Sequence, residues 1–228
     1  MSAVTRGKII SEFHLLEKKA KLLNIEPLEV YLIGGGNLAL RGLKSATKDI
    51  DVVLLSRKQF SLMQNLLETP LSKLPIYVRQ YRSQWDYDLG MSAKYLHPLY
   101  GFGFDVFVKR VLNKLYLSDS MIPRAKVPRD FEYHEFFKIH LVSKEDIFLF
   151  KSATSMERMR DIEDLIALVE TGLDYEVIIR ELGNQLSKDE SLRSLVPRII
   201  NRVDILMQQI GTVRGLIRLM QYLKEISR

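Results

Sequence analysis

The chain has 228 residues, 46% of them hydrophobic and 27% charged, with a formal net charge of +6 and no cysteine. These values are typical of a globular protein with one large domain or two small lobes, and they exclude disulfides and thiolate metal sites. No apolar run approaches the roughly 20 residues that a bilayer span needs, and the N-terminus lacks a secretory signal. We therefore expect a cytoplasmic protein with no membrane partner. The basic charge slightly favours polyanionic partners.

The first predicted element is an amphipathic helix within residues 1–23. Its hydrophobic side chains gather on one side: Ile9, Phe13, Leu15, Leu16 and Leu22. Next come two short apolar strands and a helix between them, then a helix that Ser56 would cap and that would stop before Pro70. The strands are expected at residues 28–35 and 49–55, and the helices at residues 37–43 and 56–70.

Residues 74–82 and 102–112 are further strand candidates, because they are rich in aromatic and β-branched residues. Strands and helices thus alternate over about the first 110 residues, which is typical of a sheet with helices packed on it. Beyond Val142 only helices are expected, at residues 143–153, 154–172, 174–186, 194–211 and 212–228.

Within these helices, Thr154 and Glu157 form a capping box and Gly172 marks a stop. A buried stripe is expected at Ile199, Val203, Leu206, Met207 and Ile210. The fold class is α/β (α+β): a small mixed-sheet lobe with the N-terminal helix at residues 1–120, followed by a helical lobe at residues 121–228. Residues 118–130 are the expected junction.

Two aspartates stand one residue apart inside the second strand. Asp49 and Asp51 at positions i and i+2 point to the same face of a strand, about 7 Å apart. Like charges repel unless a cation lies between them, and no cationic neighbour is evident in the sequence. If the strand carrying Asp105 lies beside this one, the three carboxylates converge and can hold two metal ions for an in-line phosphoryl displacement. The four histidines are scattered, so oxygen ligands favour Mg²⁺ or Mn²⁺ over Zn²⁺.

Three glycines, Gly34, Gly35 and Gly36, follow the first strand and open a helix. Their N–H groups and the helix N-terminus are suited to an anion cradle, and Asn37 would add a side-chain donor. The spacing is neither that of the Walker loop nor that of the dinucleotide fingerprint. A glycine turn alone is usually only a tight turn, and a lone pair of aspartates is usually a solvated face. Their combination in this order favours phosphate and metal chemistry.

Taken together, "LIGGG…KDIDVVLL" and "FDVFV" resemble the signature of the nucleotidyltransferase superfamily that includes DNA polymerase beta. The later run "SKEDIFLFKSATSMERMRDIEDLIALV" is similar to a lysine helix followed by R-x-x-D-x-x-D in bacterial and archaeal members, including toxin and abortive-infection proteins. The resemblance covers residues 28–170. Gly36 stands where many members have serine or another polar residue, so Asn37 would take over that donor role.

The resemblance implies a metal-dependent nucleotidyltransferase that moves a nucleoside monophosphate from an NTP to an acceptor hydroxyl, with the NTP between the lobes. Asp49 and Asp51 would bind both metals, and Asp105 would bind the catalytic metal and help deprotonate the hydroxyl. Lys151 would reach the triphosphate and stabilise the leaving pyrophosphate. Arg158 and Asp161 would complete the nucleotide site, with Asp164 beside them. The alternative for Arg158 and Asp161 is a plain surface ion pair.

The acceptor is predicted to be an RNA 3′ end, and among RNAs that of a tRNA. Basic residues that could track a phosphate backbone are Arg41, Lys44, Lys48, Lys109, Arg110, Arg124, Lys126 and Arg129. Tyr81, Trp85 and Tyr87 could stack an unpaired base. The alternatives are a small-molecule acceptor of the aminoglycoside type, a protein acceptor, or a non-catalytic NTP-binding module. A toxin of this kind would also have a cognate antitoxin protein as a partner.

Overall fold

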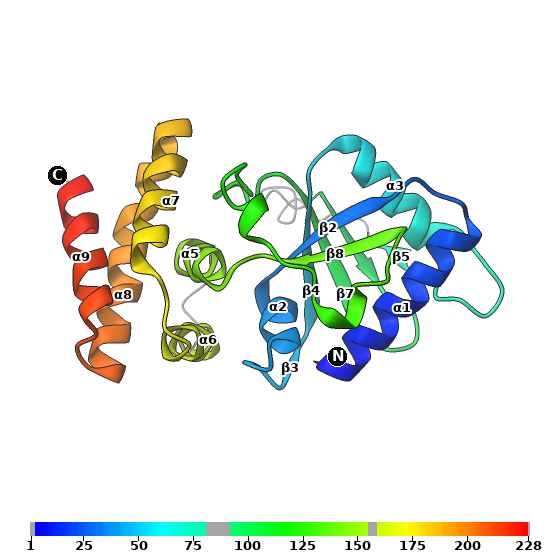
Figure 1. Ribbon diagram of the computed structural model, residues 1–228, viewed down its shortest axis with the longest axis horizontal. Helices are drawn as coiled ribbons and strands as arrows, with labels where there is room; N and C mark the ends of the chain where they lie inside the picture. The colour runs from blue at the N-terminus through cyan, green and yellow to red at the C-terminus, as the bar shows by residue number, and fades with distance from the viewer. Residues whose placement is uncertain (1–2, 81–91, 155–158, 228) are drawn as a thin grey trace. The chain divides into compact units, whose positions relative to one another are not determined.

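The computed structural model describes residues 3–80, 92–154 and 159–227 (Figure 1). The contacts between Cα atoms divide the chain into two compact units. The first unit contains residues 1–113 and 123–142, and the second contains residues 114–122 and 143–228. The chain therefore passes between the units three times, whereas the sequence suggested one boundary after residue 120.

The first unit is built on a mixed sheet of six described strands, which confirms the expected fold class. Neighbours β4 and β7 run parallel, as do β2 and β8, and the other neighbouring pairs run antiparallel. Across the sheet, the order is β5 (Val78–Arg79), β6 (Ala93–Leu96), β7 (Gly103–Val108), β4 (Asp49–Leu54), β2 (Leu28–Ile33) and β8 (Phe137–Leu141). A separate two-stranded sheet pairs β1 (Val4–Thr5) with β3 (Ala46–Thr47).

Among the residues that the structure describes, three α-helices belong to this unit: α1 (Arg6–Leu22), α2 (Gly34–Leu40) and α3 (Arg57–Glu68). Ser56 caps α3 as predicted, because its side chain accepts a hydrogen bond from the Gln59 backbone N–H. On α1, Ile9, Phe13 and Leu16 are fully buried. Leu22 was expected on the same side but is 62% exposed, because it lies in the last turn of the helix.

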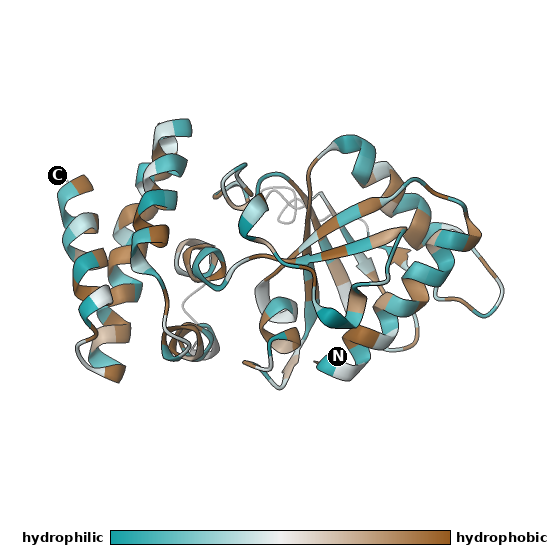
Figure 2. Ribbon diagram, in the orientation of Figure 1, coloured by the Kyte–Doolittle hydropathy of each residue, from teal (hydrophilic) through white to brown (hydrophobic). Residues whose placement is uncertain are grey.

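The core of the first unit determines which face of the sheet carries polar side chains. Phe13 packs against Phe104 of β7, with ring centroids 6.1 Å apart. Ile50 and Val52 of β4 belong to the same buried cluster. Because side chains alternate along a strand, the residues between these positions point to the opposite face. Figure 2 shows hydrophobic residues along the strands and a mixture of both kinds on the helices.

The second unit contains five helices among the described residues. They are α5 (Lys144–Thr154), α6 (Met159–Glu170), α7 (Tyr175–Lys188), α8 (Val196–Ile210) and α9 (Arg214–Ile226). A short 3-10 helix at Glu190–Leu195 precedes α8, and two more at Ile122–Arg124 and Arg129–Phe131 lie between β7 and β8 in the chain. No described helix has both the length and the apolar character of a membrane span.

Helix ends in the second unit follow local sequence signals. Gly172 has a φ of +74°, and α6 ends just before it, which confirms the predicted stop. Asp174 caps α7 by accepting hydrogen bonds from the N–H groups of Glu176 and Val177. The predicted stripe on α8 is buried at Ile199, Val203 and Leu206 and partly buried at Met207 and Ile210. The capping box of Thr154 and Glu157 includes a residue outside the described ranges.

Candidate metal and nucleotide site

Three carboxylates lie on one face of two neighbouring parallel strands. Asp51 of β4 is in register with Asp105 of β7, and Asp49 is in register with Gly103. Residues opposite each other in neighbouring strands project to the same side, and Asp49 shares that side with Asp51 two residues on. The condition that the sequence left open, that the two strands are neighbours, is therefore met. The face opposite these acids is the one that packs against α1.

A lysine that the sequence analysis did not identify lies among these acids. Lys94 of β6 is in register with Asp105, and its Nζ lies 3.1 Å from Asp105 Oδ1 and 3.3 Å from Asp49 Oδ1. Burial lowers the pKa of Lys94, but the attraction of Asp105 and Asp49 outweighs it, so the pKa is raised. The acids therefore have a cationic neighbour that was not evident in the sequence.

The donor set has the chemistry of a magnesium site, since carboxylate oxygens are the ligands that Mg²⁺ and Mn²⁺ prefer. Within residues 3–80, 92–154 and 159–227, no three His, Asp or Glu side chains are grouped so that they could hold a metal ion as they stand. Instead, the Lys94 ammonium contacts two of the three carboxylates. The carboxylates thus already surround a cation, and that cation belongs to the chain.

The glycine turn lies directly against this acidic face. Gly34 has a φ of +62°, a conformation that residues with a side chain rarely adopt. A Cβ on Gly34 would lie only 2.1 Å from Asp51 Oδ2, and one on Gly35 would lie 2.3 Å from Thr47 Oγ1. A Cβ on Gly36 would make ordinary contacts, 3.5 Å or longer. The first two glycines therefore allow the backbone to approach the site, and the third is not required in this way.

Two further residues hold the backbone of the site in place. The Thr47 hydroxyl donates to the Asp49 carbonyl over 3.0 Å. Asn37 is fully buried, and its Nδ2 donates to the carbonyls of Leu32 (2.7 Å) and Val142 (3.0 Å). The Arg41 Nε donates to Asn37 Oδ1 over 2.8 Å. The prediction that Asn37 offers a donor to a phosphate is therefore corrected. Its amide instead joins α2 to Leu32 of β2 and to Val142, the residue after β8.

The remaining predicted nucleotide residues lie in the helical unit. Lys151 of α5 places its Nζ 2.7 Å from Asp164 Oδ2 and 4.0 Å from Asp161 Oδ1, both on α6. The Lys151 and Asp164 side chains are only 11% and 6% exposed, so this is not a solvated surface lysine. Asp161 contacts Lys151, and Arg158 lies outside the described residues. Of the residues predicted to bind the nucleotide in this unit, Lys151 and Asp161 thus belong to one ion-pair network with Asp164.

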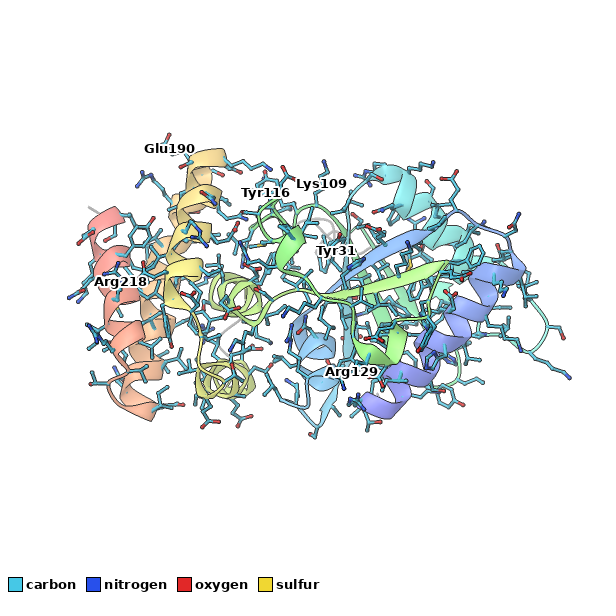
Figure 3. The ribbon with its side chains drawn as sticks, viewed as in Figure 1. Tyr31, Lys109, Tyr116, Arg129, Glu190 and Arg218 are labelled. Carbon is cyan, nitrogen blue, oxygen red and sulfur yellow. The ribbon has the colours of Figure 1, made fainter. Side chains whose placement is uncertain are left out.

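The basic residues proposed to contact RNA do not form one rim. The acids lie in the first half of β4 and β7, whereas Lys109 follows the far end of β7 and its N–H donates to the carbonyl of Leu54 at the far end of β4. Figure 3 shows Lys109 and Arg129 on opposite sides of the sheet unit. Lys126 pairs with Leu141, at the end of β8. Tyr81, Trp85 and Tyr87 lie outside the described residues.

Two of the solved structures that are similar to this chain are described as nucleotidyltransferases. No protein-family model matches the sequence, and no curated protein matches it. A protein from H. pylori described as a nucleotidyltransferase has a TM-score of 0.44 and 14% identity, and the match covers 95% of this chain and 93% of that one. The nucleotidyltransferase toxin MenT4 from Mycobacterium tuberculosis has a TM-score of 0.44 and 13% identity, over 87% of this chain and 66% of the toxin.

Proposed function

We propose that the protein is a Mg²⁺- or Mn²⁺-dependent nucleotidyltransferase that transfers a nucleoside monophosphate from an NTP to an acceptor hydroxyl. The observation that carries this proposal is the register of β4 and β7, which aligns Asp51 with Asp105 and puts Asp49 on the same face. The backbone at Gly34 passes so close to Asp51 that no side chain fits between them. Carboxylates that share a face beside an open backbone turn suit a metal-bound phosphate chain.

In this proposal, Asp49, Asp51 and Asp105 hold the metal ions, which neutralise the charge of the transferring phosphoryl group. Asp105 also accepts the proton of the attacking hydroxyl. Gly34 and Gly35 leave room for the phosphates to approach the backbone. Lys151 binds the triphosphate with the N–H groups that its contact with Asp164 leaves available, and that contact holds the ammonium in one position.

The acceptor is the least constrained part of the proposal, and an RNA 3′ end stays our first choice. Exposed basic side chains that could contact an RNA backbone include Lys48, beside Asp49, and Lys126, beside the end of β8. The alternatives remain a small molecule, a protein, or binding of NTP without transfer. A role as the toxin of a toxin–antitoxin pair would add an antitoxin protein as partner.

The experiment that tests the proposed function supplies each α-³²P-labelled NTP with Mg²⁺ and total RNA and resolves the products on a denaturing gel. We expect label in a discrete RNA band of tRNA size, and no label with the Asp105→Asn variant. Label only in small molecules or in the protein would show that the acceptor is not an RNA. The transfer reaction itself would be the same. If wild type and Asp105→Asn give the same products, or if no NTP is consumed with any acceptor, the proposal is wrong.

A further inference from the structure

Lys94 is a charged group at the proposed metal site that the proposed mechanism does not use. It reaches the site from β6, the strand beside β7, and not from the strand that carries Asp49 and Asp51. Its side chain is 19% exposed, comparable to the 25% of Asp49 and the 14% of Asp105. The ammonium therefore lies within the proposed metal site and not on the open surface.

One ammonium contacts carboxylates from two different strands. Lys94 Nζ lies 3.3 Å from Asp49 Oδ1 and 3.1 Å from Asp105 Oδ1, so one cation bridges β4 and β7. A divalent ion held by the same two carboxylates would need the same oxygens at shorter range, about 2.0–2.1 Å for Mg²⁺. An ammonium that stays on those oxygens would repel an incoming divalent ion and compete with it for the same lone pairs.

We propose that Lys94 is a built-in counter-ion of the metal site, and that a divalent metal ion binds only in exchange for its ammonium. This inference rests on the proposed metal-dependent function. It adds that the Lys94 ammonium lowers the affinity of the site for the metal ion. Without metal, Lys94 places a positive charge between Asp49 of β4 and Asp105 of β7. With metal, the Lys94 side chain turns away, and its stem of four methylene groups gives it the freedom to do so.

The exchange makes a direct prediction for the charge of Lys94. Lys94→Met keeps a similar unbranched side chain but removes the competing cation, so it should bind Mn²⁺ about tenfold more tightly than wild type, or about 1.4 kcal/mol. Lys94→Arg keeps the charge and should not bind more tightly. Lys18→Met removes the same charge from an exposed position on α1 and serves as the matched control. Free Mn²⁺ measured by electron paramagnetic resonance gives all four affinities.

A second measurement uses the unchanged protein and does not depend on a variant that folds. Lysines are acetylated with a low dose of acetic anhydride and quantified by mass spectrometry, with and without saturating Mn²⁺. We expect acetylation of Lys94 to increase several-fold when Mn²⁺ binds, because the amine leaves its carboxylate partners, while Lys18 stays constant.

The outcomes separate this inference from the proposed function. Equal Mn²⁺ affinity in wild type and Lys94→Met, or unchanged acetylation of Lys94 on Mn²⁺ binding, would overturn the exchange and leave metal-dependent transfer standing. If neither protein binds Mn²⁺, with or without NTP, both the exchange and the proposed function are wrong.

Discussion

Each unit of the protein holds a lysine between two aspartates, and the two arrangements differ in how the chain builds them. In the sheet unit, β4, β6 and β7 each supply one member of the group, Asp49, Lys94 and Asp105. In the helical unit, Lys151 of α5 meets Asp161 and Asp164, which stand three residues apart on α6. The first group is set by strand register and the second by the period of one helix.

The two groups also differ in how deeply their ion pairs are buried, and so in what it costs to separate the lysine from its aspartates. Lys151 and Asp164 are 2.7 Å apart and almost fully buried, so separating them exposes a buried charge. Lys94 lies farther from its partners, at 3.1 and 3.3 Å, and more of its side chain is exposed. We infer that the lysine of the sheet unit is exchangeable, and that the lysine of the helical unit is a fixed part of its network.

The largest effect is expected from removing an acid of the sheet unit. Asp51→Ala should weaken Mg²⁺-dependent NTP binding by more than about 100-fold, because losing even an outer partner of a metal ligand typically costs 10–100-fold. Titration calorimetry with and without Mg²⁺ measures it. Glu26→Gln, which removes an exposed carboxylate that pairs with Lys58, is the control and should bind as wild type does. Equal affinities for Asp51→Ala and wild type would contradict the metal site.

The glycine turn offers a matched pair of substitutions next to the same acid. Gly34→Ala places a methyl group 2.1 Å from Asp51 Oδ2 and forces a positive φ on alanine, so Mg²⁺–NTP affinity should fall about 10-fold or more. Gly36→Ala makes only ordinary contacts of 3.5 Å and longer, and it should bind nearly as well as wild type. The same calorimetry applies. Similar losses in both variants would show that the turn acts through the fold and not through Asp51.

The two lysines can be compared directly by their effects on stability. Lys151→Met should lower the free energy of unfolding by about 2–3 kcal/mol, because it leaves Asp164 buried without its cation. Lys94→Met should lower it by about 1 kcal/mol, since Asp49 and Asp105 are 25% and 14% exposed and Asp164 only 6%. Urea unfolding followed by circular dichroism gives both values. Mn²⁺ should stabilise Lys94→Met more than Lys151→Met, because only the first variant has lost the cation that competes for the metal site. Equal losses, with no difference in rescue, would remove the distinction between the two groups.

Lys19 shows what a buried lysine does without aspartates. Its Nζ donates to the carbonyls of Leu67 and Pro75, and burial lowers its pKa to about 8. Between that pKa and the unfolded value of 10.5, the unfolded chain binds more protons, so stability from this group rises with pH across this window. Wild type should gain about 2 kcal/mol over Lys19→Met between pH 8 and 10. Parallel stability curves for the two proteins across that range would contradict the shift.

Much of the sheet unit follows from local sequence patterns. The strands that carry Asp49, Asp51 and Asp105 are apolar runs long enough to recognise, and Ser56 and Gly172 mark helix ends by their own chemistry. The neighbouring strand β6 has only four residues, with a single lysine in the alternating pattern Ala93-Lys94-Tyr95-Leu96. That alternation is a signal for a strand, but it does not show which acid lies opposite the lysine.

The errors share one physical cause, which is pairing between distant segments. Asn37 is a suitable donor by its chemistry, but Val142 lies more than a hundred residues later in the chain and accepts one of its hydrogen bonds. Lys109 follows Asp105 closely in sequence, yet four residues of extended strand carry it about 13 Å away. Register, and the direction in which a strand leaves a site, depend on the whole sheet and cannot be read from a local pattern.

The most direct test of the central claim is a crystal structure of the protein with Mn²⁺ and a non-hydrolysable NTP, using anomalous scattering to locate the metal. We predict an anomalous peak among the carboxylates of Asp49, Asp51 and Asp105, with the phosphates beside Gly34 and with Lys94 Nζ no longer contacting Asp49 and Asp105. A bound NTP with no peak among these carboxylates, and with Lys94 still paired to them, would contradict the account.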